Sequence, residues 1–336
     1  MITKKQITRL YEKKYRVAVI GDIMVDRYIF GNVDRVSPEA PVPVCRVTKE
    51  ESVPGGAANV ARNLADFGGC VYLLGVIGCG DKAGNEIKAL SESMNIDVSG
   101  CIETTERPTT VKTRIVGNGQ QIARVDRESD EEISKTVEEK LYQKCRLLEG
   151  KVDLIIVSDY SKGVLTEKIV NALRQLIDSG IMVAVDPHPS NKVNWDSFSI
   201  IKPNLHEFKC MSGNEMRDYE SGDPRISDSF KKGVFKLIEK WKSDHLLVTL
   251  SADGMYYYNA LNKMDAWQPT KSAEVFDVSG AGDTSMAFFA LALTAGWNGE
   301  DAMSLANAAS GIVIRKMGTA SVSCKELIQS LTEGSA

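Results

Sequence analysis

The sequence predicts an α/β fold, in which a doubly wound, mostly parallel sheet is flanked by helices and carries a small β lid. Continuous apolar runs at 17–20 and 71–78 are typical of strands buried on both faces. From about residue 134 onward, helical and strand-like patterns alternate, as in repeated βαβ units. Insertions at about 27–50 and 98–127 combine prolines and turn signals with strand-like pieces, which favours a peripheral sheet. We interpret residues 1–336 as a single domain whose lid is formed by these insertions.

The bulk composition argues against several classes of function. With 336 residues and a net charge of -4, the chain offers no electrostatic attraction to nucleic acid or to an anionic membrane. No apolar run approaches the ~20 residues that span a bilayer, and the N-terminus lacks the apolar core of a signal peptide, so we expect a cytoplasmic protein. Seven cysteines without a Cys-x-x-Cys pair, and three histidines without metal-ligand spacing, argue against a disulfide framework and a zinc enzyme.

The first half of the chain places polar side chains near the ends of predicted strands. After a short amphipathic helix, the first buried strand runs into Asp22. Ligands of open α/β sheets bind beyond the carboxyl ends of strands, so Asp22 and Asp26 are placed to bind a polyol, with a surface-turn acid as the alternative for Asp26. A later helix begins with Gly55 and Gly56, which allow a ligand to come close, and with Asn59, which offers both a donor and an acceptor.

Two strand-like segments joined by Asn118-Gly119 predict a hairpin that completes the lid, because Asn-Gly is a strong signal for a two-residue turn. Lys112, Arg114 and Arg124 alternate along this hairpin and therefore share one face. Two interpretations of this face are open. It is either solvated, or it forms a positive surface over an anionic sugar phosphate.

The second half of the chain predicts further buried strands at 154–159, 181–186, 199–202 and 246–250. The first two end in Asp159 and Asp186, at the edge where ligands bind. Asn204 and Glu207 open the next helix on one face, and this pair suits a hydrated Mg²⁺ that carries nucleotide phosphates. An N-cap with a capping-box acid fits the same spacing equally well. The predicted fold is completed by a turn at 251–255, an antiparallel edge at 256–258 and helices at about 284–296, 299–316 and 324–332.

A stretch of small residues near the C-terminus predicts the chemistry. Gly280, Ala281 and Gly282 lie between a strand-like approach and an apolar helix, so their backbone N–H groups and the helix dipole form an anion pocket. Asp283 lies on its rim, where a carboxylate is useful if it takes a proton from a substrate hydroxyl. We therefore predict phosphoryl transfer, with Asp283 as the base and the three small residues as the cradle. The alternative is a tight connection with no ligand.

These motifs, in this order, resemble the ribokinase-like (PfkB) family of carbohydrate kinases over about residues 15–325. Within that family the chain is most similar to the D-glycero-β-D-manno-heptose 7-phosphate kinases. The closer similarity lies in Gly21-Asp22-Ile23-Met24-Val25-Asp26, Ser37-Pro38-Glu39-Ala40-Pro41-Val42-Pro43, Pro54-Gly55-Gly56-Ala57-Ala58-Asn59, Gln120-Gln121, Ser158-Asp159-Tyr160-Ser161-Lys162-Gly163 and Lys202-Pro203-Asn204.

The resemblance implies an ATP- and Mg²⁺-dependent kinase that phosphorylates the anomeric C1 hydroxyl and gives the 1,7-bisphosphate. The product would serve ADP-heptose synthesis for lipopolysaccharide or another surface glycan. Because the chain stops soon after the kinase motifs, we expect the form without a fused nucleotidyltransferase. We also expect a homodimer formed through the exposed edges of the lid.

Carried over by position, the resemblance makes Asp283 the base and Gly280, Ala281 and Gly282 the anion hole. The implied sugar-binding residues are Asp22, Asp26, Gly55, Gly56, Asn59, Lys112, Arg114, Gln121 and Asp159. The implied nucleotide-binding residues are Asn204, Glu207, Thr249, Ser251, Gly254 and Asn307, of which Asn204 and Glu207 hold Mg²⁺ through water. Asp277 and Ser279 match a loop that can hold K⁺ in relatives. His188 stands where relatives often have a lysine, and Gly117-Asn118-Gly119 replaces a basic hairpin turn of some relatives.

Three rival functions are open at this point. Another ribokinase-like sugar kinase is the nearest, and a sensor that binds a sugar or a nucleotide without turnover is the second. A Rossmann dehydrogenase is the third and the least supported, because the glycine-rich loop at 78–84 is one residue too long for a dinucleotide loop.

Overall fold

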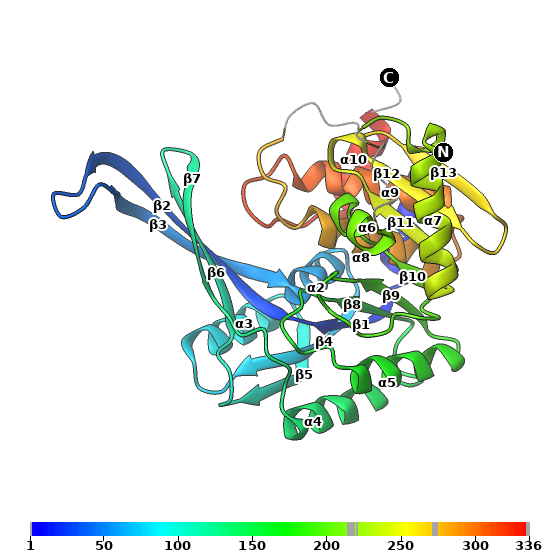
Figure 1. Cartoon of the computed structure of the whole chain (residues 1–336), viewed down its shortest axis with the longest axis horizontal. Helices are drawn as coiled ribbons and strands as arrows, with labels where there is room; N and C mark the ends of the chain where they lie inside the picture. The colour runs from blue at the N-terminus through cyan, green and yellow to red at the C-terminus, as the bar shows by residue number, and fades with distance from the viewer. Residues whose placement is uncertain (1, 214–218, 220, 271–274, 334–336) are drawn as a thin grey trace.

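A nine-stranded sheet lies at the centre of the main body of the chain (Figure 1). The computed structural model describes residues 2–213, 219, 221–270 and 275–333. In spatial order its strands are β13 (Met264–Gln268), β12 (Met255–Asn259), β11 (His245–Thr249), β10 (Ile200–Ile201), β9 (Met182–Asp186), β8 (Leu154–Ser158), β1 (Arg16–Gly21), β4 (Cys70–Gly78) and β5 (Ile96–Thr104). In this order, the strands from β11 to β5 pair in parallel, whereas β12 pairs antiparallel with both β11 and β13.

Both faces of this sheet are covered by helices, which explains the continuous apolar runs in its strands. Along β8, Leu154 and Ile156 join one core cluster, whereas Ile155 and Val157 join the other. The first cluster lies under α1 (Lys4–Glu12), α2 (Ala57–Asp66), α3 (Lys82–Ser93), α8 (Ala281–Thr294), α9 (Gly299–Val313) and α10 (Cys324–Glu333). The second lies under α4 (Lys135–Arg146), α5 (Glu167–Asp178), α6 (Leu205–Ser212) and α7 (Asp228–Trp241). Short 3₁₀ helices form at η2 (Pro224–Ile226) and η3 (Ser251–Asp253).

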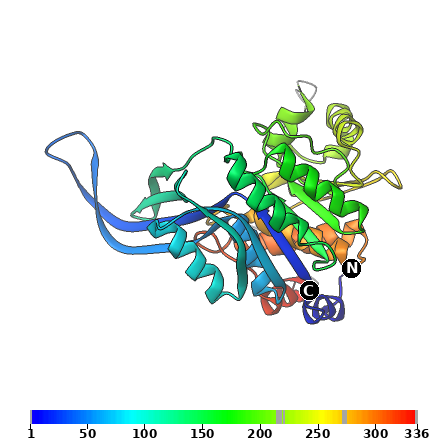
Figure 2. The same cartoon turned by 90° about the horizontal axis from the view of Figure 1, so that it is seen from below.

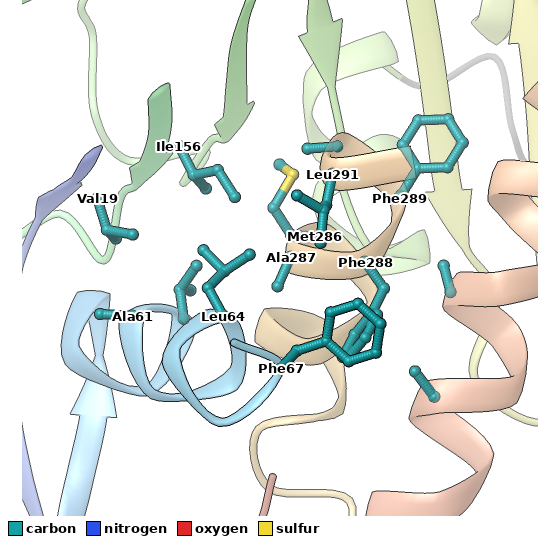
Figure 3. Close-up of a cluster of buried hydrophobic side chains, with 14 of the residues drawn as sticks. Val19, Ala61, Leu64, Phe67, Ile156, Met286, Ala287, Phe288, Phe289 and Leu291 are labelled. Atoms are coloured by element: carbon teal, nitrogen blue, oxygen red, sulfur yellow. The ribbon is translucent and has the colours of Figure 1, made fainter. Parts of the chain in front are cut away.

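Helix α8 is fixed in place by its packing against α2 (Figure 3). Its side chains from Asp283 to Leu293 are all buried, so it is a core helix with no solvent-facing stripe over this length. Phe288 packs edge-on against Phe67 at the end of α2, with ring centroids 5.0 Å apart. Leu64 and Met286 lie in the same cluster. This packing sets the position of the first turn of α8, which carries the predicted cradle and base.

The lid is a four-stranded sheet that projects from the body (Figures 1 and 2). Its strands, in spatial order, are β3 (Pro43–Gly56), β2 (Ile23–Val36), β6 (Thr110–Gly117) and β7 (Gln120–Arg127). The predicted hairpin is confirmed as β6–β7, with Asn118 and Gly119 both at positive φ (51° and 83°), as a primed two-residue turn requires.

Two sequence predictions about strands are corrected. Residues 98–104, which we assigned to the lid insertion, form most of β5 and pair with β4 in the main sheet. The strand at 256–258 is antiparallel as expected, but β13 pairs with it and takes the edge position instead. In the part of the chain that the structure describes, no helix is long and apolar enough to cross a membrane.

Candidate active site

Asp283 lies in the first turn of α8, and its carboxyl group is buried. Its Oδ2 accepts a hydrogen bond of 2.8 Å from Asn59 Nδ2, and its Oδ1 accepts one of 3.0 Å from the Tyr160 hydroxyl. Gly280 is the N-cap residue of the helix in the left-handed conformation (φ 80°). The structure thus brings Asp283 and Asn59, predicted from distant parts of the sequence, into direct contact.

The environment of Asp283 suits a group that exchanges a proton near neutral pH. Burial raises the pKa of its carboxyl group to about 7, and the nearby Asp186 carboxyl adds to this effect. The hydrogen bonds from Asn59 and Tyr160 act in the opposite direction, because they stabilise the ionised form. A carboxyl group with a pKa near the working pH is effective as a general base.

Asn59 is held in place by a buried polar network between α2 and α8. The Asn63 side chain donates to the Asn59 carbonyl oxygen at 2.9 Å, and Thr284 Oγ1 donates to Asn63 Oδ1 at 3.0 Å. Asn63 Nδ2 also donates to the side-chain oxygen Oδ1 of Asn59 at 3.5 Å, which leaves the Asn59 amide nitrogen facing Asp283. Asn59 therefore holds the Asp283 carboxylate through its Nδ2 atom, and the predicted contact of Asn59 with the sugar stays a prediction.

The predicted cradle is only partly available in this structure. The Ala281 N–H donates to the Val278 carbonyl oxygen at 3.2 Å, inside the turn that precedes the helix. The N–H groups of Gly282 and Asp283 are in the first helical turn, where the helix itself supplies no partner. Such N–H groups, together with the positive end of the helix dipole, favour binding of an anion at the start of a helix.

Asp22 and Asp159 follow the neighbouring strands β1 and β8, as predicted from the parallel sheet. Asp22 Oδ2 accepts hydrogen bonds from the N–H groups of Tyr160 (2.8 Å) and Lys162 (3.1 Å), whereas no described protein group bonds its buried Oδ1. Asp159 accepts from the N–H groups of Ser161 and His188. Burial, aided by the Asp22 charge, raises the pKa of Asp159 to about 7, and burial also raises the pKa of Asp22. The loop after β8 therefore links these carboxylates to Asp283 through Tyr160.

Asp26 is buried in β2, so the interpretation as a surface-turn acid is wrong. Its Oδ1 accepts from Arg114 Nη1 at 2.5 Å and its Oδ2 from Thr319 Oγ1 at 3.2 Å. The Arg114 guanidinium also lies over the Tyr28 ring, 5.3 Å from its centroid. Gly55 pairs across the lid with Met24, next to Asp26. The predicted sugar residues of β2 and β3 are thus grouped at the base of the lid.

The predicted positive face of the hairpin β6–β7 consists of Lys112, Arg114 and Arg124, and each of these side chains pairs with an acidic residue. Lys112 pairs with Asp126 (3.3 Å) and Glu128 (3.0 Å), and Arg124 also pairs with Asp126. Arg114 and Arg124 are direct cross-strand neighbours, which confirms that they share one face. The face is therefore a network of ion pairs, while Gln121 lies on the exposed strand β7.

The residues predicted to bind the nucleotide lie around the carboxyl ends of β10 and β11. Asn204 bridges to Thr249, and the turn that follows contains Ser251 and Gly254, both at positive φ. Asn307 of α9 donates to the Pro269 carbonyl oxygen at 3.0 Å.

Asn204 and Glu207 form a capping box, so this interpretation of their spacing is confirmed. Glu207 Oε2 accepts from the Asn204 N–H at 2.7 Å, and Asn204 Oδ1 accepts from the Glu207 N–H at 2.9 Å. The other carboxylate oxygen of Glu207, Oε1, takes no part in the capping-box hydrogen bonds. Among the described residues no group of three or more His, Cys, Asp or Glu side chains is placed to hold a metal. The residues fit a hydrated Mg²⁺ held through water and substrate phosphates, and they do not form a protein cage.

Asp277 closes the turn that precedes α8. Its Oδ1 accepts from the Ser279 N–H at 2.9 Å, and its Oδ2 accepts from the Gly318 N–H at 3.1 Å. The loop that contains Asp277 and Ser279 is thereby attached to the segment after α9, next to the Gly280 cap.

Sequence reasoning missed two side chains of this site, Tyr160 and Lys202. Tyr160 bonds Asp283, and Lys202 is a buried ammonium that pairs with Asp186 at 2.8 Å. Both occur in motifs that carried the family resemblance, Asp159-Tyr160 and Lys202-Pro203. That motif membership was the available signal, but the direction of each side chain depends on the tertiary structure.

The pfkB family carbohydrate kinases match this chain over residues 14–326. The chain belongs to this family and is a carbohydrate kinase with the ribokinase-like fold. Curated relatives named bifunctional protein HldE include one from Desulfatibacillum aliphaticivorans, 38% identical over 316 residues, covering 93% of this chain and 62% of the relative. Another, from Hyphomonas neptunium, is 39% identical over 319 residues, covering 94% of this chain and 63% of the relative. The chain thus spans less than two thirds of the length of these relatives.

Solved structures share the fold at low sequence identity. Ribokinase from Arabidopsis thaliana, complexed with ribose and ATP, superposes with a TM-score of 0.72 at 19% identity, covering 94% of this chain and 98% of that chain. Phosphofructokinase-2 from Escherichia coli, in complex with substrates and products, has a TM-score of 0.76 at 18% identity, covering 96% of this chain and all of that chain (100%).

Proposed function

We propose that this kinase transfers the γ-phosphoryl group of ATP to the anomeric C1 hydroxyl of D-glycero-β-D-manno-heptose 7-phosphate, as a step of ADP-heptose synthesis for lipopolysaccharide or another surface glycan. The observation that supports this choice of substrate is the 36–39% identity to HldE relatives over almost the whole chain. The contact of Asp283 with Asn59 and Tyr160, at the first turn of α8, supports the reaction type.

In the proposed step, Asp283 accepts the proton of the C1 hydroxyl while the new O–P bond forms and the bridging O–P bond of ATP breaks. ADP leaves with the bridging oxygen. The Gly282 N–H and the dipole of α8 stabilise the negative charge of the transferred group. General-base help of this kind contributes roughly 10²–10⁴ in rate. Bound Mg²⁺, held through water near Asn204 and Glu207, would neutralise phosphate charge.

Asp22, Asp26 and Asp159 are assigned to the sugar hydroxyls. The unbonded Oδ1 of Asp22 supports this assignment, because a buried carboxylate oxygen is stabilised by a donor such as a sugar hydroxyl. The lid strands β2 and β3 supply Asp26 and Gly55 from the other side. The lid would also keep water from competing for the γ-phosphoryl group.

The experiment is NMR of the product after incubation with the heptose 7-phosphate, ATP and Mg²⁺. A new anomeric phosphate signal coupled to H1, in the β configuration, is the expected result. Fructose 6-phosphate and ribose serve as competing acceptors. Faster turnover of either would make this chain another sugar kinase of the family, and binding without any turnover would make it a sensor.

A potassium site at Asp277 and Ser279 is part of the proposal. The E. coli phosphofructokinase-2 structure in complex with potassium shares the fold at 17% identity. The turn at Asp277 is joined to the cap of α8, so a cation bound there would act on the cradle. Turnover with K⁺ should exceed turnover with Na⁺ at equal ionic strength. Equal rates in the two salts would contradict this site.

Two copies of the chain are proposed to pair through the lid. Its outer strands β3 and β7 have edges that no other strand of this chain covers among the described residues, and an uncovered edge favours pairing. Val47, Ile122 and Val125 on these strands are exposed. Light scattering should therefore give a molar mass twice that of one chain. Val125→Lys, which places a charge on the edge strand β7, should lower the measured mass. Leu147→Lys, at an exposed position outside the lid, is the control.

A further inference from the structure

A buried ammonium group lies at the same edge of the sheet as Asp283. Lys202 directly follows β10, is 2% exposed, and pairs through Nζ with Asp186 Oδ2 at 2.8 Å. Asp186 ends the neighbouring strand β9 and is itself partly exposed. A lysine is almost never this buried without a specific partner, and one carboxylate leaves two of its three N–H donors for other acceptors.

The Lys202 ammonium lies close to Gly282 of the predicted cradle. A Cβ atom built on Gly282 would lie 3.7 Å from Lys202 Nζ, which is the nearest described atom outside its own helix and chain neighbours. The space beside the Cα atom of Gly282 is therefore bounded by this positive charge. Gly282 keeps that space free, because any side chain there would enter it.

Several carboxylates surround the Lys202 ammonium. Asp186, Glu207 and Asp283 all act electrostatically on Lys202. A γ-phosphoryl group that enters beside Asp283 brings further negative charge. A helix dipole provides only about half a unit of positive charge, which a buried ammonium can supplement.

We propose that Lys202 binds the γ-phosphoryl group directly, together with the Gly282 amide, and is a catalytic residue of the transfer. The Nζ donors that Asp186 leaves open bond the phosphoryl oxygens, and Asp186 keeps the ammonium aimed at them. This inference rests on the proposed cradle at α8, but it is independent of which sugar accepts the group.

The test compares nucleotides with and without a γ-group, in the absence of any sugar. Wild-type protein should bind the ATP analogue AMP-PNP with Mg²⁺ more tightly than ADP with Mg²⁺, measured by calorimetry. In Lys202→Met the affinity for AMP-PNP should fall by about tenfold or more, since a charge-assisted hydrogen bond is lost, while the affinity for ADP changes by less than about threefold. Equal losses for both nucleotides, or no loss, would overturn the proposal.

Two variants separate this role from a structural one. Lys202→Met leaves the Asp186 carboxylate unpaired, so Lys202→Met/Asp186→Asn removes both charges together and should keep the fold. This double variant should show the same selective loss of AMP-PNP affinity. Asp186→Asn alone keeps the ammonium and should retain the preference for AMP-PNP. Lys168→Met, which removes a surface lysine paired with Glu139, is the matched control and should bind both nucleotides normally.

A direct structural measurement decides the matter even if the variants are unstable. Crystals of the wild-type protein with ADP, Mg²⁺ and aluminium fluoride contain a mimic of the transferred group. Lys202 Nζ should lie within about 3.2 Å of a fluoride. A separation beyond about 4.5 Å would overturn the proposal. If the heptose is not a substrate, the proposed function fails while these nucleotide measurements still decide the role of Lys202.

Discussion

The hydroxyl of Tyr160 donates a 3.0 Å hydrogen bond to Oδ1 of Asp283, while Asn59 occupies the other carboxylate oxygen. Tyr160 comes from the loop after β8, and Asp283 from the first turn of α8, 123 residues further along the chain. The Tyr160 backbone N–H also bonds Asp22. Tyr160 thus joins the proposed base to the proposed sugar site. A substitution at Tyr160 should therefore change the pKa of Asp283 while the carboxyl group itself stays in place.

Tyr160→Phe should move the acid limb of the pH–rate profile to higher pH. Asp283 must be ionised to accept a proton, so kcat/KM should fall as the pH drops below the pKa of about 7. The lost hydroxyl stabilised the ionised form, so its removal raises that pKa further. The measurement is kcat/KM between pH 5.5 and 9. Tyr11→Phe, at an exposed tyrosine of α1, should leave the profile unchanged. A profile of Tyr160→Phe that coincides with wild type would show that this bond does not tune the base.

Asp283→Asn should retain the fold and ATP binding and lose turnover by at least about a hundredfold. The amide has nearly the same shape as the carboxyl group but cannot accept the substrate proton. Circular dichroism and calorimetry with ATP check the fold and the nucleotide site, and a coupled ADP assay checks turnover. Turnover near the wild-type rate would rule out Asp283 as the base.

Gly280→Ala should lower kcat, and the loss should be larger than that of a control variant with a similar loss of folding stability. Gly280 has φ 80°, and a Cβ there would approach Asn59 Nδ2 to 2.7 Å, so the amide that holds Asp283 must move. Positive φ alone costs a non-glycine residue roughly 1–2 kcal/mol. We expect kcat to fall by about tenfold or more.

Gly296→Ala is the matched control for this variant. Gly296 follows the other end of the same helix at φ 81°, and its added Cβ would meet no described atom within 4 Å. It should lose a similar amount of stability in urea and keep its kcat. Equal kcat losses in the two variants would mean that backbone strain, not displacement of Asn59, lowers the rate.

The sequence predicted the parts of the site that depend on local pattern or on strand ends. Asp22 and Asp159 could be placed together because adjacent parallel strands end at one edge. Gly280 and Asp283 could be placed because a small-residue turn precedes an apolar helix. The contact of Asp283 with Tyr160 could not be predicted, since it depends on the direction of one side chain in a loop. Residues 98–104 were assigned wrongly because a strand of the main sheet and a strand of the lid have the same local pattern, and only long-range pairing separates them.

The Asp26–Arg114 pair is another case that local pattern leaves open, and it gives a prediction about stability. The two residues are 88 positions apart in sequence and come together because β2 pairs with β6, where Asp26 is opposite Lys112 and Tyr28 is opposite Arg114. Their side chains are 9% and 14% exposed. Arg114→Met leaves the carboxylate unpaired and should lower the free energy of unfolding by roughly 3–5 kcal/mol.

The double variant Asp26→Asn/Arg114→Met tests the cause of that loss. It removes both charges, so it should recover most of the stability in urea unfolding, because the cost comes from the unpaired carboxylate more than from the lost bond. Arg46→Met breaks the exposed pair with Asp34 at the far part of the lid and should change stability by less than about 1 kcal/mol. If the double variant is no more stable than Arg114→Met, the guanidinium stabilises the lid mainly through its packing on Tyr28, which lies 5.3 Å away.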